Sequence, residues 1–244
     1  MQYVSSRTAA ILDRVQILSF EHLMPIIVAI FFFIILVRDS KTKSLETQKM
    51  RIHRISIFIA ITLAIFHVQK SIRYDYDLQS DLPLYLCSLL GLLIPIYTYY
   101  RRFWMFEVLL FWIIVGTIQG ILTPDIAEGF PSLDYFRYWV VHLGLLGIIF
   151  YEIIIFNRRP RFISIFKSYG ALQVYVIIII TINYFLDANY FYLNEKPKSA
   201  SLLDYFGDWP AYLIVSQLII LPLFFLVYLP FSNLLKGKER SFSK

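Results

Sequence analysis

Residues 18–37 read LSFEHLMPIIVAIFFFIILV, and the basic segment RDSKTK follows them directly. A run of about 20 mainly apolar residues is long enough to cross the hydrocarbon core of a bilayer as one helix. The run has no small-residue cleavage site behind it, and the basic residues there are typical of a helix that stays in the membrane. This stretch therefore predicts a retained transmembrane span, not a signal peptide, and it indicates an integral membrane protein.

The rest of the 244-residue chain has the same apolar character. It is 58% hydrophobic and 18% aromatic, with a mean hydropathy of +0.63. Only 16% of its residues are charged, whereas soluble domains carry about a quarter. We predict an all-α membrane protein with one domain, residues 1–244, built as a bundle of about seven transmembrane helices. The further apolar runs lie at 55–69, 82–100, 103–122, 135–156, 169–186 (extending to 193 at most) and 209–230.

The basic residues are divided unequally between the two sides of this predicted bundle. Sixteen Lys and Arg residues fall on the side of the connection after residue 37, and seven fall on the other side. Because cytoplasmic connections carry the excess of Lys and Arg, the amino terminus is predicted outside and the carboxy terminus in the cytoplasm. The expected location is a cell membrane, most simply the bacterial plasma membrane. The net charge of +6 is then a topology signal, and no nucleic-acid partner is expected.

A single cysteine, Cys87, limits the chemistry that the chain can perform. It excludes an intrachain disulfide and a cysteine-based metal cluster. The four histidines show no spacing typical of metal ligands. We therefore expect no metal and no organic cofactor.

Polar side chains gather in the predicted outer third of the bundle. At about 1.5 Å per residue, Cys87 lies roughly 8 Å and His142 roughly 10 Å below the outer boundary. The inner half is apolar except for Glu107 and Glu152, which we expect to form ion pairs with nearby arginines. This pattern predicts a polar pocket open to the outer leaflet and closed below. Its further expected members are His22, His67, Gln119, Asn183, Asn189, Trp209 and Tyr212.

The residues alone leave two interpretations of Cys87 open. A cysteine in an apolar run such as LPLYLCSLL, residues 82–90, often serves as a small packing residue. A histidine at the same depth, here His142, is also the usual activator of a cysteine nucleophile. His22 and His67 have a plain interpretation as interfacial or core histidines.

The outer connection 187–208 reads DANYFYLNEKPKSASLLDYFGD and mixes aromatic residues with turn residues. This composition is typical of a segment in the membrane interface, so an aromatic belt is one interpretation. The other is a lid over the pocket, with Lys196 or Lys198 offered to a lipid phosphate. In that case His22, Lys196, Trp209 and Tyr212 are the expected lipid-binding residues. Residues 1–17 are expected to form a short interfacial segment.

Four stretches carry a resemblance to a known family. They are LPLYLCSLL (82–90), GTIQGILTPDI (116–126), YWVVHLGLL (138–146) and the run 183–213, NYFLDANYFYLNEKPKSASLLDYFGDWPAYL. Their order and spacing resemble the YwaF-like family of bacterial integral membrane proteins, which is similar to a eukaryotic membrane acyltransferase acting on ether phospholipids. The resemblance implies a cysteine nucleophile at Cys87 and a histidine partner at His142. The family pattern often has a histidine two residues before the cysteine, where this chain has Tyr85. If that histidine assists catalysis, either His67 or Tyr85 takes its role here or the activity of this chain differs.

The leading prediction is a membrane lipid acyltransferase with a thioester acyl-enzyme on Cys87 and His142 as general base and acid. Membrane lipids would be both acyl donor and acceptor. Gln119, Asn183 or Asn189 would donate hydrogen bonds to the oxyanion. With water as acceptor, the same site would make a lipase or esterase. The remaining alternatives are a transporter or lipid-binding protein without chemistry, and a structural membrane subunit.

Overall fold

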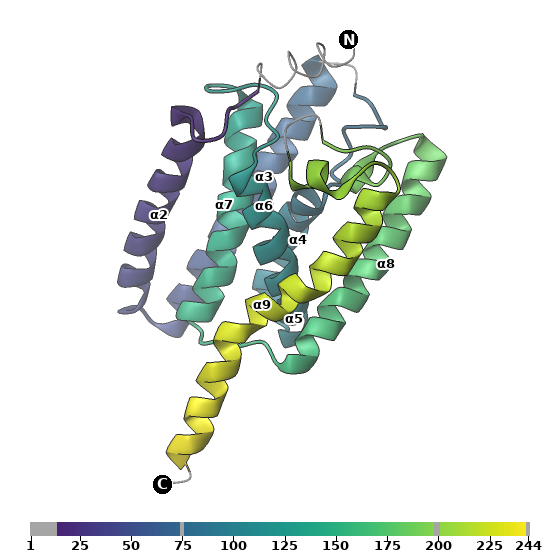
Figure 1. Ribbon diagram of the computed structural model, residues 1–244. Coiled ribbons are helices and arrows are strands. Elements are labelled where there is room, and N and C mark those ends of the chain that lie inside the picture. The colour runs from purple at the N-terminus through teal and green to yellow at the C-terminus, as the bar shows by residue number, and fades with distance from the viewer. Residues whose placement is uncertain (1–13, 74–75, 198–200, 243–244) are drawn as a thin grey trace.

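The computed structural model describes residues 14–73, 76–197 and 201–242, the last ten of them by backbone alone. Every regular element in these ranges is helical, and seven helical segments form the bundle (Figure 1). Residues 1–13 of the predicted interfacial segment and Lys198 lie outside the described residues. The seven segments are α2 (Phe20–Ser40), α3 (Leu45–Arg73), α4 (Leu86–Tyr100), the unit α5 (Phe103–Trp112), η1 (Ile113–Thr117) and α6 (Ile118–Leu122), α7 (Leu133–Ile154), α8 (Phe162–Leu186) and α9 (Ala211–Phe242).

Neighbouring segments alternate in direction, so their connections fall at two ends of the bundle. The upper end, as drawn in Figure 1, holds the connections 74–85, 123–132 and 187–210. The lower end holds the connections 41–44, 101–102 and 155–161. Two short 3₁₀ turns, η2 (Tyr190–Tyr192) and η3 (Leu202–Phe206), lie within the connection 187–210.

Six of the segments are long and apolar enough to cross a membrane, and the prediction of a multi-pass helical protein is confirmed to that extent. The exception is α4, which has only 15 residues. At about 1.5 Å per residue it spans about 22 Å, less than a hydrocarbon core of about 30 Å.

The prediction that the third span begins at residue 82 is wrong, because α4 begins at Leu86. Pro83 has no main-chain N–H, and side chains from distant elements hydrogen-bond to the backbone beside it. The main-chain N–H of Leu82 donates to the Tyr190 hydroxyl at 2.9 Å, and the Tyr175 hydroxyl donates to the carbonyl of Leu84 at 2.6 Å. Cys87 therefore lies in the first turn of α4.

The ends of α3 and α8 also differ from the predicted ends of their spans. An apolar run marks only the membrane-buried part of a helix, so α3 continues beyond its run into polar sequence at both ends, to 45–73. The helix α8 begins seven residues before its predicted start and covers 162–186. The extension of the sixth span to residue 193 is wrong, because Asp187 adopts a left-handed conformation (φ 51°) and ends α8 at Leu186.

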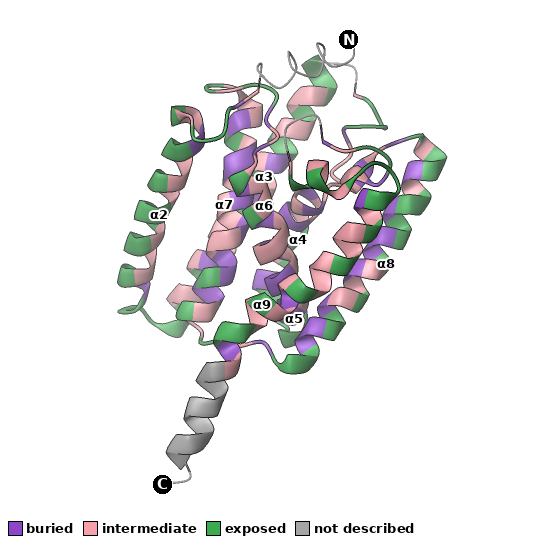
Figure 2. Ribbon diagram, in the orientation of Figure 1, coloured by how far each residue is buried: buried purple, intermediate pink, exposed green. Residues whose placement is uncertain are grey.

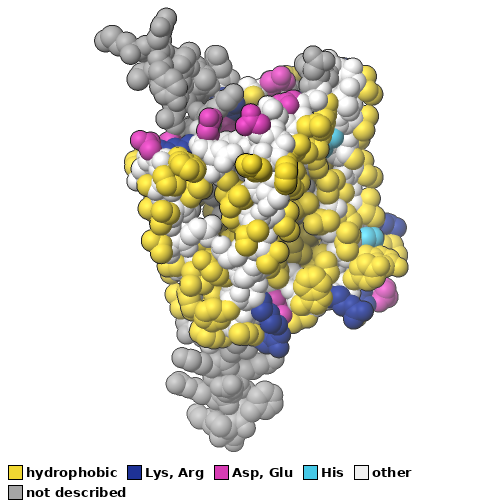
Figure 3. Space-filling model, turned by 90° about the vertical axis from the view of Figure 1, so that its right-hand side faces the viewer, with side chains coloured by type: hydrophobic (Ala, Val, Ile, Leu, Met, Phe, Trp, Pro, Cys, Tyr) yellow, Lys and Arg dark blue, Asp and Glu magenta, His cyan; other side chains and the backbone are white. Residues whose placement is uncertain are grey.

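The core lies where α3, α4, α7 and the α5–η1–α6 unit meet, and α2 and α9 lie at the periphery (Figure 2). A Cβ atom on Gly91 would lie 3.4 Å from both Leu63 of α3 and Val141 of α7, so the three helices are in close contact at this level. The outward faces are strongly apolar, as lipid contact requires. On the face drawn in Figure 3, hydrophobic side chains cover the middle of the molecule and charged groups lie near the two ends.

Two buried carboxylates organise the lower end. Glu107 pairs with Arg161 at 2.8 Å and with Lys167 at 3.0 Å. Glu152 pairs with two arginines of the same end, Arg101 at 3.0 Å and Arg158 at 3.1 Å. The predicted ion pairs are confirmed, and they join α5 to α8 and α7 to the flanking connections.

Candidate functional site

Cys87 lies at the upper end of α4, and its thiol is partly buried. Its Sγ lies 3.9 Å from the hydroxyl oxygen of Thr117, a side chain that is fully buried. The first-turn N–H groups of a helix carry a partial positive charge, and this charge favours a thiolate placed among them. The position of Cys87 is therefore suited to a nucleophile as well as to packing.

Thr117 is placed by an irregularity in its helix. Residues Ile113–Thr117 form a π-helical turn between α5 and α6, a feature that often occurs at functional sites. A Cβ atom on Gly116 would lie 3.4 Å from Leu86, which shows how closely this turn approaches the start of α4.

His142 is buried on α7, with 8% of its surface exposed. Its Nδ1 lies 2.8 Å from the main-chain carbonyl oxygen of Tyr138. Because a carbonyl only accepts, Nδ1 carries the proton of the neutral ring and Nε2 is the basic nitrogen. The Tyr138 ring stacks on the imidazole with 4.0 Å between centroids.

The segment that contacts Cys87 also contacts His142. A Cβ atom on Gly120 would lie 2.8 Å from His142 Nε2, and Gly120 is three residues beyond Thr117. The two predicted partners therefore lie against neighbouring positions of η1 and α6. No hydrogen bond joins Cys87 to His142, two residues that the structure describes in full, so their roles as nucleophile and base stay predictions.

Arg137 is a charged group of the site that the sequence reasoning did not single out. It lies on α7, five residues before His142. Its Nε donates to Asp134 at 3.1 Å, and its guanidinium lies 4.4 Å from the centroid of the Phe66 ring. The available signal was its position inside the predicted span 135–156, because charged residues within spans tend to mark function.

The three amides expected to bind an oxyanion are engaged within the chain. The Gln119 amide donates to Thr123 Oγ1 at 2.9 Å. Asn183 exchanges two 2.9 Å hydrogen bonds with the backbone of Tyr190. Asn189 binds backbone groups of the connection 187–210, including the carbonyl of Glu195 at 2.9 Å. Each amide holds a turn in place, and the hydrogen bond that each was expected to donate to an oxyanion stays a prediction.

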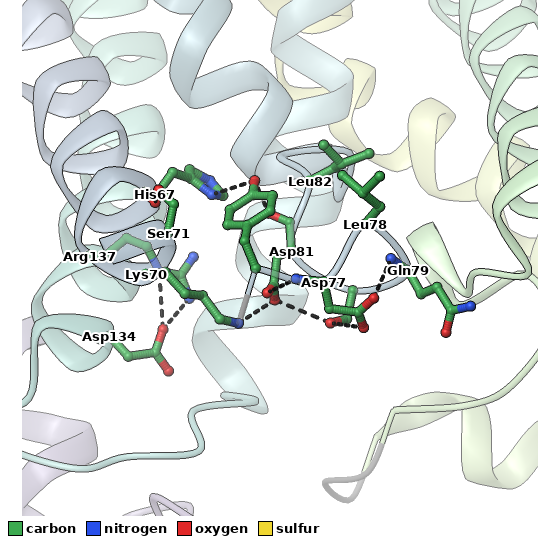
Figure 4. Close-up of polar contacts among 12 residues, drawn as sticks. His67, Lys70, Ser71, Asp77, Leu78, Gln79, Asp81, Leu82, Asp134 and Arg137 are labelled. Atoms are coloured by element: carbon green, nitrogen blue, oxygen red, sulfur yellow. Dashed lines mark hydrogen bonds and ion pairs between the residues drawn. The ribbon is translucent and has the colours of Figure 1, made fainter. Parts of the chain in front are cut away.

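His67 lies at the upper end of α3 with one nitrogen bound and one without a partner (Figure 4). Its Nδ1 is 3.3 Å from the Tyr76 hydroxyl, which donates to the carbonyl of Asp81 at 2.9 Å. His22 differs, because its Nδ1 accepts from the N–H of Leu18 and its Nε2 is 2.8 Å from the carbonyl of Ile121. Both nitrogens of His22 are therefore bound to the backbone.

Asp81 holds the connection that precedes α4, described from residue 76 to residue 85, by several polar contacts (Figure 4). Its carboxylate pairs with Lys70 and accepts from the N–H of Asp77 at 2.9 Å. Burial alone raises the pKa of Asp81, but the hydrogen bonds from Lys70 and Asp77 outweigh it and hold that pKa below its usual value.

The described parts of the connection 187–210, residues 187–197 and 201–210, fold over the upper end of the bundle and contain or adjoin three of the predicted lipid-binding residues (Figure 1). Lys196 pairs with Asp208 at 3.4 Å. The indole of Trp209 donates to the carbonyl of Leu193 at 3.3 Å, and the Tyr212 hydroxyl donates to the carbonyl of Tyr192 at 2.8 Å. These contacts hold the connection against the bundle, and the lipid-binding roles stay predictions.

Tyr85 and Tyr192 link this connection to α4. Tyr85 directly precedes α4, and its ring centroid lies 5.2 Å from that of Tyr192. In the described part of the chain, no three His, Cys, Asp or Glu side chains come together as metal ligands would.

Comparison with known proteins gives one family. A family model described as the TMEM164 family matches residues 17–228, a range that includes every site residue discussed above. Neither the curated proteins nor the solved structures contain a match. The resemblance to the YwaF-like family and to an ether-phospholipid acyltransferase has no support in this match and stays a prediction.

Proposed function

The chain belongs to the TMEM164 family of membrane proteins, and on this premise we propose that it is a lipid acyltransferase with Cys87 as the acyl carrier. One observation carries the proposal. A single helical stretch, Thr117 to Gly120, contacts both Cys87 and His142, and the hydrogen bond at Nδ1 leaves His142 Nε2 as the basic nitrogen.

The first half-reaction forms a thioester. His142 Nε2 takes the thiol proton while Cys87 Sγ attacks the ester carbonyl carbon of a donor lipid. Main-chain N–H groups in the first turn of α4 stabilise the oxyanion. The carbon–oxygen bond then breaks, and the departing lipid alkoxide takes the proton from His142.

The second half-reaction returns the enzyme to its starting state. The hydroxyl of an acceptor lipid gives its proton to His142 and attacks the thioester carbonyl. The carbon–sulfur bond breaks, and the thiolate of Cys87 regains the proton. A water molecule in place of the acceptor lipid would make the same site a hydrolase.

Acyl transfer to Cys87 is tested directly with purified protein and a phospholipid labelled in its acyl chain. We expect label on the protein that neutral hydroxylamine releases, because thioesters are cleaved under these conditions. Cys87→Ala should carry no label, and Cys87→Ser should carry at most a label that resists neutral hydroxylamine. His142→Gln should acylate about 100-fold more slowly than the wild type.

The products separate the alternatives. Transfer of label from the acyl-enzyme to an added lysophospholipid identifies a transferase, and release as free fatty acid identifies a hydrolase. A wild-type protein that never carries label, under conditions in which it remains folded, would rule out the acyl-enzyme and favour a lipid-binding protein without chemistry.

A further inference from the structure

Tyr138 holds His142 by two independent contacts. Its carbonyl oxygen accepts from Nδ1 at 2.8 Å, and its ring stacks on the imidazole with centroids 4.0 Å apart and planes at 22°. The first contact selects the tautomer and the second fixes the plane of the ring. A displacement of Tyr138 therefore displaces the nitrogen that is to act as base.

The hydroxyl of Tyr138 is itself held by two backbone groups. It donates to the carbonyl of Gly120 at 2.7 Å and accepts from the main-chain N–H of Asp125 at 3.4 Å. Through this hydroxyl, α7 is joined to the end of α6 and to the connection 123–132.

Asp125 carries the linkage to the connection 187–210. Its Oδ2 accepts from the Tyr192 hydroxyl at 3.0 Å, and its Oδ1 pairs with Arg14. Burial raises the pKa of Tyr192 well above its usual value, so the hydroxyl keeps its proton and remains the donor.

The backbone at Tyr192 is unusual. Phe191 and Tyr192 adopt positive φ angles of 61° and 56° in succession, a conformation that bulky residues rarely adopt. Strain of this kind persists only where surrounding contacts enforce it, and it tends to occur at functional sites. Here it brings the Tyr192 ring against Tyr85, two residues before Cys87, and its hydroxyl onto Asp125.

We propose that Tyr192, Asp125 and Tyr138 are positioning residues through which the connection 187–210 sets the placement of His142 relative to Cys87. Tyr192 is linked to both members of the pair. Its ring packs against Tyr85, at the start of the helix that carries Cys87. Its hydroxyl is linked to His142 through Asp125 and Tyr138. The acyl-transfer part of this inference rests on the proposed function. The connection acts as a clamp that keeps the pair aligned.

The test compares Tyr192→Phe and Tyr138→Phe with a matched control, Tyr205→Phe. Tyr205 lies in the same connection, and its side chain is 85% exposed. Both site variants keep the aromatic ring and remove only a hydroxyl. We expect each to lower the rate constant for Cys87 acylation about tenfold, with the KM for donor lipid changed by less than about twofold. Tyr205→Phe should match the wild type.

The double variant tests whether the two hydroxyls act through one linkage. If they do, Tyr138→Phe combined with Tyr192→Phe should be no slower than the slower single variant. Effects that multiply, or a Tyr192→Phe protein that acylates at the wild-type rate, would overturn the inference. Thermal unfolding of each variant shows whether it is folded, and Tyr192→Phe is the milder change if Tyr138→Phe does not fold.

A second readout separates this inference from the proposed function. Cys87 is the sole cysteine, so its alkylation by iodoacetamide can be followed without background. We expect Tyr192→Phe to slow alkylation near pH 7, because a misplaced His142 no longer takes the thiol proton. Absence of acyl label on the wild type overturns the proposed function alone, whereas alkylation of Tyr192→Phe at the wild-type rate overturns the clamp.

Discussion

Gly120 shows how a single missing side chain supports the site. An added Cβ atom would lie 2.8 Å from His142 Nε2 and 3.2 Å from the Tyr138 hydroxyl, and the stack and the Nδ1 hydrogen bond hold the imidazole in place. We expect Gly120→Ala to slow Cys87 acylation about 100-fold, because a shift of about 1 Å in a reacting group has an effect of that size. Acylation rates of the purified variants measure it.

The matched control for Gly120→Ala is Gly170→Ala on α8, where an added Cβ atom meets nothing within 4 Å. It should acylate at the wild-type rate. If Gly120→Ala does so too, the imidazole tolerates displacement and the close approach of α6 has no part in catalysis.

At the residue scale, the sequence predicted which side chains are chemically suited to the site but not how they are held. Depth along each span indicated Cys87 and His142 together. The stack of Tyr138 on His142 gave no such signal, because a tyrosine four residues before a histidine on an apolar helix is equally compatible with ordinary packing.

One buried carboxylate, Asp81, holds together the part of the connection at 76–81 and joins it to α3. Asp81 is 6% exposed and binds Lys70 and the N–H of Asp77. We expect Asp81→Asn to reduce the free energy of unfolding at pH 7 by about 2 kcal/mol, a typical contribution of hydrogen bonds to a charged group. Thermal or denaturant unfolding in detergent measures the loss.

The pH dependence of this effect follows from the direction of the pKa shift. The pKa of Asp81 is lower in the folded protein than in the unfolded chain, so its contribution is present above the unfolded value of about 4 and is lost as the pH falls below it. The difference between wild type and Asp81→Asn should therefore shrink at pH 3. Asp208→Asn is the control, since Asp208 is exposed and its pair with Lys196 should contribute less than about 1 kcal/mol. A constant difference between pH 7 and pH 3 would contradict the assignment to Asp81.

At the element scale, apolar runs predicted the helices because each run is a local property of the chain. The start of α4 depends instead on partners far away in sequence. Tyr175 and Tyr190 hydrogen-bond to the backbone of residues 82–84, more than 90 residues earlier. No local sequence pattern indicates such a contact. The span predicted from residue 82 therefore placed Cys87 farther from the start of its helix than it lies in α4.

At the scale of the whole molecule, the candidate catalytic residues and most of the basic residues lie at opposite ends. The upper end holds Cys87 and His142, whereas the lower end is held by buried Glu107 and Glu152 among arginines and a lysine. The segments at the lower end, residues 38–54, 101–102 and 158–167, carry twelve of the 23 Lys and Arg residues of the chain. Since cytoplasmic connections carry the excess of basic residues, the upper end should face outward and the site should draw its lipids from the outer leaflet.

This orientation is tested by labelling single cysteines in intact cells, in a Cys87→Ala background. Asp208→Cys, in the upper connection 187–210, should react with a membrane-impermeant maleimide added outside. Lys43→Cys, in the lower connection 41–44, should react only after the membrane is permeabilised. Both positions are exposed in the structure, so lack of reaction reports the membrane barrier and not burial. The reverse pattern would place Cys87 on the cytoplasmic side and require that the acyl donor and acceptor come from the inner leaflet.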